Sequence, residues 1–151
     1  MQYNFTIAME LILKTGLKNL KFGQSTEDAI NAFGKPDREY QNSDDENEFI
    51  LEWNKHKLRL TFYENENRKL GYIRTSHTEA HINGHVLINQ EIDAAKQGFD
   101  KDFDWEADSY DFFQTHLNEE HWIVLNVEYN RITDIELGVP LKNEDEYAWP
   151  V

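Results

Sequence analysis

The sequence predicts an α+β fold, in which two tandem units, each a short helix followed by antiparallel strands, form one curved sheet with the short helices on one face. Three observations lead to this prediction. They are a capped helix near the N-terminus, runs in which apolar and other residues alternate as in strands, and a similar order of elements in the second half. With 151 residues, of which 39% are hydrophobic, the chain is long enough for a single compact domain over residues 1–151.

The predicted helix begins after Ser25 and ends at Gly34. Ser25 is a favourable N-cap, because its hydroxyl oxygen accepts a hydrogen bond from a free amide of the first turn. Glu27 and Asp28 suit the positive end of the helix dipole. Gly34 allows the chain to leave the helix, and the following Pro36 cannot continue it. Such a short helix is stable only when it packs against a sheet.

Strands are predicted where apolar residues alternate with other residues. These runs are residues 3–13, 49–53, 58–62, 70–75, 123–127 and 131–135. A second short helix is predicted at residues 90–97. Both halves then have the order helix, acidic loop, strands, which predicts internal repeats at about residues 16–76 and 82–140. Residues 141–151 are predicted to form an irregular C-terminal tail held down by Trp149.

The charge is strongly negative and unevenly distributed. Acidic residues number 29 and basic residues 15, which gives a net charge of -14. Residues 1–75 carry 12 acidic and 11 basic side chains, whereas residues 76–151 carry 17 acidic and 4 basic ones. Nearly all of the imbalance therefore lies in the second half. It forms either a solubilising surface or an electrostatic attractor for a basic partner.

Composition excludes several classes of function. Nucleic-acid binding and adsorption to anionic membranes both need a basic surface, so neither is expected. The chain has no cysteine, which excludes disulfides, thiol catalysis and thiolate metal sites. No apolar run approaches the ~18 residues of a membrane span, and the N-terminal stretch lacks the features of a secretion signal. We expect a soluble, cytoplasmic protein.

The motif most indicative of chemistry is the acidic segment from Asp100 to Asp111, whose carboxylates are spaced like those of a calcium-binding loop. Two residues oppose this interpretation. Trp105 occupies the place where such a loop needs glycine for its sharp turn, and Asp111 replaces the longer glutamate that binds through both oxygens. The segment is therefore expected to be a loop between a helix and a strand, with no metal bound.

Histidines offer two further candidates for chemistry. His77, His81 and His85 recur at every fourth position, as zinc ligands on one helix do. The Asn-Gly step between His81 and His85 interrupts any helix, so a connector between the halves is predicted instead. His116 and His121 flank a predicted turn. No glycine-rich phosphate loop, nucleophile elbow or paired-carboxylate signature is present, so neither a cofactor nor a catalytic residue is expected, and the chain is not predicted to be an enzyme.

A known repeat pattern is visible in Phe22-Gly23-Gln24-Ser25 and, after the short helix, in Phe33-Gly34-Lys35-Pro36-Asp37. It resembles the repeat of β-lactamase-inhibitor-like proteins and of the small lipoprotein of the outer-membrane assembly machinery. The second half departs from it: Asn89 stands near the position of the first glycine, and Gly98-Phe99 inverts the later pair. The resemblance implies a sheet whose open face grips a protein. Small acidic proteins of this kind also resemble immunity proteins of bacterial polymorphic-toxin systems.

The remaining signal combines acidic and aromatic side chains in the second half. The strand from Trp122 to Glu128 has apolar residues on both faces. Since only one face packs against helices, the other is covered either by the chain itself or by a partner. Tyrosine and tryptophan are common anchors of protein interfaces, so we predict that a basic partner docks here on Tyr110 or Trp122. The acidic residues expected to steer it are Asp100, Asp102, Asp104, Glu106, Asp108, Glu119 and Glu120.

Three functions are consistent with these features. The first, which we predict, is a protein-binding inhibitor. In its most specific form it is an immunity protein that neutralises a basic toxin, such as a nuclease, by direct binding. The second is a small ligand- or calcium-binding module centred on residues 100–111. The third is an acidic housekeeping protein with no catalytic role.

Overall fold

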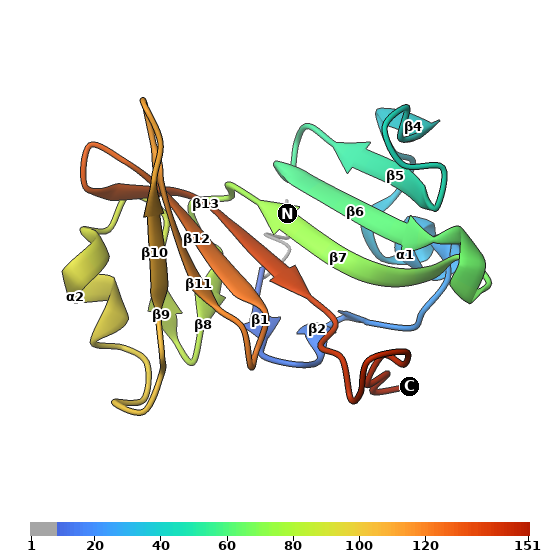
Figure 1. Cartoon of the computed structure of the whole chain (residues 1–151). Helices are drawn as coiled ribbons and strands as arrows, with labels where there is room; N and C mark the ends of the chain where they lie inside the picture. The colour runs from blue at the N-terminus through green and yellow to red at the C-terminus, as the bar shows by residue number, and fades with distance from the viewer. Residues whose placement is uncertain (1–8) are drawn as a thin grey trace.

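The structure is a computed structural model that describes residues 9–151, and strands make up most of its regular structure (Figure 1). The elements in chain order are β1 (Leu11–Ile12), β2 (Gly16–Leu17), β3 (Leu20–Lys21), α1 (Thr26–Phe33), β4 (Arg38–Gln41), β5 (Glu48–Trp53), β6 (Leu58–Tyr63), the 3₁₀ turn η1 (Glu64–Glu66), β7 (Lys69–Thr75), β8 (His81–Ile82), β9 (His85–Val86), α2 (Ile92–Lys96), β10 (Glu106–Ser109), β11 (Gln114–Asn118), β12 (Ile123–Glu128) and β13 (Arg131–Gly138).

The prediction of an α+β fold is wrong, because the protein is mostly β. Helix α1 has 8 residues and α2 has 5, whereas one antiparallel sheet contains 8 strands. The prediction missed β4, β10 and β11. Strands β4 and β10 have polar sequences, Arg-Glu-Tyr-Gln and Glu-Ala-Asp-Ser, and form the two edges of the sheet. Because side chains at an edge reach water on both faces, an edge strand does not need the apolar alternation on which the prediction relied.

The large sheet joins the two halves of the chain through their last strands. Its order is β10-β11-β12-β13-β7-β6-β5-β4, and every neighbouring pair is antiparallel. Strand β13 pairs with β7, which places Glu136 opposite Arg74 and Leu137 opposite Ile73. Figure 1 shows β10 to β13 on one side of this junction and β4 to β7 on the other. The middle of the sheet is therefore built from residues distant in sequence, and the predicted repeat boundaries stay a prediction.

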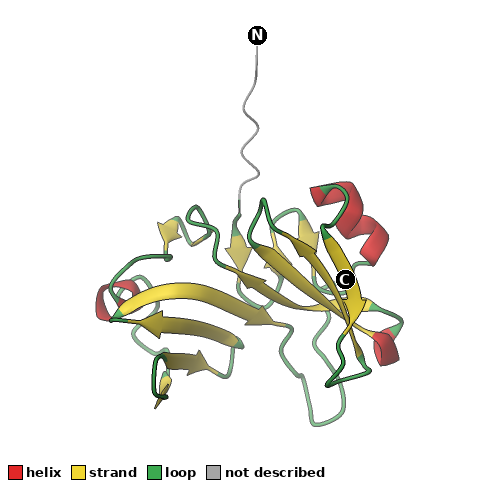
Figure 2. Ribbon diagram, turned by 90° about the horizontal axis from the view of Figure 1, so that it is seen from above, coloured by secondary structure: helices red, strands yellow, loops and turns green. Residues whose placement is uncertain are grey.

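One face of the sheet packs against the rest of the protein. Leu60, Leu125 and Ile135 from central strands are fully buried on it. Ala29 of α1 and Ile92 of α2 belong to the same apolar core. Figure 2 shows the curvature of the sheet, with the helices toward its opposite ends. Since one face is occupied by the core, the residues that alternate with the core positions must lie on the other face.

The helix predicted after Ser25 is confirmed as α1. The Ser25 hydroxyl oxygen accepts from the Asp28 amide at 3.1 Å, and an Asp28 carboxylate oxygen accepts from the Ser25 amide at 3.1 Å. This capping box satisfies two otherwise free backbone donors. Gly34 follows the helix with a φ of 87°, which side chains with a Cβ rarely adopt. Neither helix described within residues 9–151 is long and apolar enough to cross a membrane.

The predicted connector between the halves is confirmed and contains a β-hairpin. Strands β8 and β9 are joined through Asn83 and Gly84, whose φ values are 51° and 80°. Two successive positive φ values are typical of the tight turns that connect paired strands. Of the strand predicted over residues 3–13, residues 3–8 lie outside the described residues, and Leu11–Ile12 form β1.

The C-terminal tail is irregular, as predicted, and aromatic side chains hold it to the domain. The Tyr147 ring stacks on Tyr63, with centroids 5.4 Å apart, and Trp149 packs on Tyr147 at the same separation. Val151 lies over Gly23, where an added Cβ would be only 2.9 Å from a methyl group of Val151. The tail therefore stands against the first half of the sheet, where it borders the groove described below.

Candidate functional site

The face of the sheet opposite the core carries a row of polar side chains across five strands. In β6, for example, Arg59 lies between Leu58 and Leu60, which are both buried. We call this surface the open face. It is defined here by Glu52, Arg59, Tyr72, Arg74, Asn126, Asp134 and Glu136.

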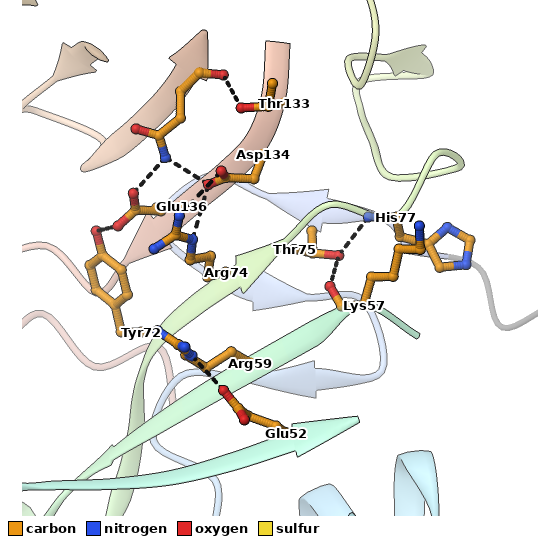
Figure 3. Close-up of polar contacts among 11 residues, drawn as sticks. Glu52, Lys57, Arg59, Tyr72, Arg74, Thr75, His77, Thr133, Asp134 and Glu136 are labelled. Atoms are coloured by element: carbon orange, nitrogen blue, oxygen red, sulfur yellow. Dashed lines mark hydrogen bonds and ion pairs between the residues drawn. The ribbon is translucent and has the colours of Figure 1, made fainter. Parts of the chain in front are cut away.

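On the open face, polar side chains of β7, β12 and β13 hydrogen-bond to one another (Figure 3). Arg74 donates to both oxygens of Asp134, at 3.1 and 3.2 Å. The Asn126 amide donates to Asp134 and to Glu136, in each case at 2.6 Å, and the Tyr72 hydroxyl donates to Glu136 at 2.7 Å. Burial, and then the charge of Glu136, raise the pKa of Tyr72. The tyrosine therefore stays neutral and holds its hydrogen bond throughout the physiological range of pH.

A second cluster centres on Glu52 in the first half. Its carboxylate accepts from Arg59 at 2.9 Å, from Arg38 at 3.2 Å and from the Tyr40 hydroxyl at 3.0 Å. Arg59 and Arg74 face each other in register across β6 and β7. Arg59 binds Glu52 and Arg74 binds Asp134, so each of the two positive charges has its own carboxylate. The polar groups of the open face are thus fixed in place by one another.

Beside this network the open face is hollowed into a groove of about 880 Å³. It lies over β5, β6, β7 and the end of β13, between the turn from β11 to β12 and the segment from Gly138 to Ala148. Its aromatic lining consists of Tyr63, Tyr72, Trp122 and Tyr147. Its acidic lining consists of Glu48, Glu119, Glu120 and Glu136. Three basic side chains, Lys14, Arg59 and Arg74, also line it, and Lys14 pairs with Glu120 at 3.8 Å.

Two glycines of the open face allow aromatic rings to lie directly on the sheet. At Gly138 an added Cβ would be 2.5 Å from the Trp122 ring and 3.0 Å from the Tyr72 ring. The Tyr63 ring covers Gly71 in the same way. Trp122 reaches its place because it ends the turn before β12 with a φ of 46°. Glycine in a strand leaves room for close approach of another group, and at Gly71 that group is the Tyr63 ring.

The structure separates the predicted partner-binding residues into three places. Glu119, Glu120 and Trp122 line the groove. Asp100, Asp102 and Asp104 are exposed in the loop that follows α2. Glu106 and Asp108 are exposed on the edge strand β10, and Tyr110 lies exposed at the tip between β10 and β11. Only the first group lines the groove, and a partner-binding surface that includes all nine residues stays a prediction.

The loop that follows α2 is held by aromatic side chains. Trp105 packs on Phe99, and Phe103 stacks on the His121 ring with centroids 4.6 Å apart. The Asp104 carbonyl accepts from the Asn118 amide at 3.1 Å. Residues Glu106–Ser109 continue as an extended strand, which differs from the tight wrap of a calcium-binding loop. Among residues 9–151, no three His, Asp or Glu side chains gather as metal ligands would.

Sequence reasoning missed the charged network on the open face. Arg59, Arg74 and Asp134 each sit in a strand that is otherwise apolar at alternate positions, and this was the available signal. A charged residue at an alternate position of a central strand indicates a face without a covering layer. Which carboxylate meets which arginine depends on the pairing of β7 with β13, and no local pattern encodes that pairing.

Comparison with known proteins finds no matching family model and no matching curated protein. Two solved structures align with the chain. An extracellular protein containing an SCP domain from Bacillus anthracis aligns with a TM-score of 0.57 and 11% identity, over 91% of this chain and 48% of that chain. A DUF4309 family protein, YjgB, from Bacillus subtilis aligns with a TM-score of 0.48 and 14% identity, over 81% of this chain and 83% of that chain.

The chain spans about half the length of the SCP-containing protein, since it covers 48% of that chain. At 11% identity the likeness concerns the fold alone. Neither protein is described as β-lactamase-inhibitor-like or as an immunity protein, so that resemblance stays a prediction.

Proposed function

We propose that the chain is a non-catalytic, protein-binding inhibitor that neutralises a basic partner. In its most specific form it is a cytoplasmic immunity protein against a basic toxin, such as a nuclease. The observation that carries the proposal is the groove on the open face. There, four aromatic side chains lie beside four carboxylates, and aromatic anchors surrounded by complementary charge are typical of protein interfaces.

The chemistry of the groove favours a partner with arginine or lysine side chains. Tyr63 and Tyr147 present a stacked aromatic pair, and Glu48 is close enough to contribute, after burial and Tyr147, to the raised pKa of Tyr63. An aromatic pair next to a carboxylate accommodates a guanidinium or ammonium group by cation–π and ionic attraction together. Glu119 offers a further carboxylate at the opposite wall.

The rigidity of the open face also supports a binding role. Tyr72, Arg74 and Asn126 are held by the hydrogen bonds described above, so little side-chain entropy is lost when a partner covers them. A nuclease surface must attract phosphate groups. An acidic inhibitor that fits such a surface is therefore attracted by the same positive electrostatic field that attracts the nucleic acid.

The test is to sequence the genes next to the one that encodes this chain and to co-express the chain with any toxin domain found there. We expect growth to be restored by the unaltered chain, and purified toxin to bind it directly. Trp122→Ala combined with Glu119→Gln should weaken binding at least about thirtyfold and abolish protection. A matched control, Val86→Ala with Glu79→Gln, changes an exposed apolar and an exposed acidic residue away from the groove. A neighbouring toxin that neither binds nor is neutralised would overturn the proposal.

The size of the groove favours a second candidate function, the binding of a small molecule. A cavity of about 880 Å³ lies within the range of about 300–1,000 Å³ that small-ligand sites occupy. Native mass spectrometry of the purified chain separates the two candidates. A bound small molecule that is lost in Gly138→Ala, where a Cβ would displace the Trp122 ring, supports the second candidate. A ligand-free mass together with toxin binding supports the first.

A further inference from the structure

The edge strand β10 leaves backbone groups free to pair with another strand. At the end of this strand the Tyr110 amide donates to the Phe113 carbonyl at 2.8 Å. Within the strand, Asp108 lies opposite Thr115 and Glu106 lies opposite Leu117, and no bulge interrupts the pairing. Because bonded and non-bonded pairs alternate in an antiparallel ladder, Glu106 and Asp108 bond to β11, whereas Ala107 and Ser109 direct their backbone groups outward. All four residues are exposed, and within residues 9–151 β10 pairs only with β11.

The charge of this edge selects what can pair with it. Glu106 and Asp108 are two positions apart, so both carboxylates lie on one face of the sheet. Neither forms an ion pair in the described part of the chain. A second copy of β10 added to this edge would bring carboxylates against carboxylates, which is unfavourable for strand pairs. A strand with lysine or arginine at alternate positions would instead meet both carboxylates with opposite charge.

Beyond the last residue of β10, exposed aromatic side chains gather at the same end of the sheet. Tyr110 is 57% exposed, Phe112 84% and Phe113 42%, and the Tyr110 and Phe113 rings stack at 4.7 Å. Tyr129, 98% exposed, lies in the neighbouring turn from β12 to β13. The register places this turn next to the tip, since Gln114 stands opposite Val127. We call these four residues the aromatic tip. Exposed aromatic residues grouped in this way are typical of interaction sites.

We propose that the β10 edge accepts an extended, basic segment of a protein partner as an additional strand. The segment hydrogen-bonds to the outward groups of Ala107 and Ser109. It places lysine or arginine side chains beside Glu106 and Asp108, and its end packs on the aromatic tip. Addition of a strand to an exposed sheet edge is a known mode of peptide recognition, in which the backbone supplies affinity and alternate side chains supply specificity. This site is separate from the groove and adds a second point of contact to the proposed function.

The experiment uses two short synthetic peptides, one alternating lysine with valine and one alternating glutamate with valine. Each is titrated into the isotopically labelled full chain at low salt, and backbone amide shifts are followed by NMR. We expect the lysine peptide to bind at least about tenfold more tightly than the glutamate peptide. The largest shifts should fall on the amides of Ala107 and Ser109, and binding should weaken as salt is added.

Two kinds of variant make the test decisive. Ala107→Pro removes one outward donor at an edge, where proline is tolerated, and should abolish binding, whereas the control Ala107→Thr keeps the donor and should retain it. Glu106→Lys with Asp108→Lys should reverse the preference, so that the glutamate peptide binds better. This reversal is informative even if the proline variant fails to fold.

Three results would overturn the proposal. The first is equal binding of the two peptides to the unaltered chain. The second is a set of peptide-induced shifts that excludes Ala107 and Ser109. The third is a dimer in sedimentation experiments that Ala107→Pro dissociates, since the edge would then belong to a second copy. These results do not depend on the groove, because Trp122→Ala should leave the peptide-induced shifts of Ala107 and Ser109 unchanged. The edge proposal and the inhibitor proposal can therefore fail separately.

Discussion

The two edge strands of the sheet each carry two charged side chains, and they use them differently. On β4, Arg38 binds Glu52 at 3.2 Å and its guanidinium lies 4.6 Å from the Tyr40 ring. On β10, Glu106 and Asp108 have no cationic partner among residues 9–151. On the first edge Arg38 is paired and Glu39 forms no ion pair within residues 9–151, whereas on the second edge both charged side chains are unpaired.

The same contrast holds for the two halves of the chain. Two acidic residues of the second half pair with basic residues of the first: Asp134 with Arg74, and Glu120 with Lys14. The charge that stays free is concentrated in the loop after α2 and on β10. The net charge of a sequence segment therefore does not show which of its carboxylates are free to bind a charged partner. The pairing of strands decides which carboxylates remain available.

The largest effect is expected when the free acids of the second half are removed. Neutralising Asp100, Asp102, Asp104 and Glu106 together should slow association with a basic partner about tenfold at low salt and flatten its salt dependence. The matched control neutralises four exposed acidic residues of the first half that do not line the groove, Glu39, Asp44, Asp45 and Glu46. Stopped-flow association rates at two salt concentrations provide the measurement. If only the first-half variant loses binding, the docking surface lies in the first half and the charge asymmetry serves solubility alone.

A smaller effect, on stability, should distinguish paired from unpaired carboxylates. Glu52→Gln removes a charge whose side chain is only 14% exposed and which two arginines share. Arg59 would then face Arg74 without its own counter-charge, and we expect a loss of about 1–3 kcal/mol in the free energy of unfolding. Glu106→Gln, at the free edge, should stay within about 0.5 kcal/mol. Urea unfolding of both variants measures the difference, and equal losses would contradict the contrast between the two edges.

Local signals predicted the elements that are stabilised locally. Ser25 and Gly34 bound α1 as expected, because a helix cap needs only residues a few positions apart. Leu58, Leu60 and Phe62 identified β6, because a central strand buries alternate side chains. The edge strand β10 was missed, because Glu106 and Asp108 carry no burial signal. The fold class was wrong for the same reason, since the missing strands make the protein mostly β.

The candidate site was predicted less completely than the elements. Trp122 was selected for its aromatic character, and it does line the groove. Its position on Gly138 depends on a turn and on the register between β12 and β13, which a local pattern does not encode. The contact between Arg74 and Asp134 was not predicted for the same reason, because it depends on the register between β7 and β13. The exposure of Phe112 could not be predicted either, because the turn that carries it joins β10 and β11, which the sequence did not reveal.

A modest pH effect should arise from His116 in the second half. Burial, and then nearby Lys96, lower the pKa of His116 from its ordinary value of 6.5, while Asp93 acts in the opposite direction. Its Nδ1 has no hydrogen-bond partner in the described structure. Below pH 6.5 the unfolded chain binds a proton at this ring more readily than the folded chain, so this contribution to stability is complete above pH 6.5 and is lost as the pH falls.

The comparison of melting temperatures at pH 7.5 and at pH 5.5 tests this assignment. His116→Leu should reduce the fall in melting temperature that acidification causes, because the leucine cannot be protonated. His85→Leu, at an exposed position, is the control and should leave the fall unchanged. An identical pH response in all three proteins would show that the buried ring does not govern stability in this window.

The smallest effect, no change at all, is expected from calcium. The acidic residues from Asp100 to Asp111 resemble a calcium loop only in spacing, because the Trp105 ring packs on Phe99 and residues 106–109 form a strand. Melting curves with excess calcium and with chelator should therefore coincide, since a ligand stabilises only the state that binds it. Asp100→Asn with Asp102→Asn should melt identically in both conditions. The opposite result would be a clear rise in melting temperature with micromolar calcium that this variant abolishes. It would show that the unpaired acids of the second half bind an ion, so that the contrast between the two halves concerns metal binding instead of partner recognition.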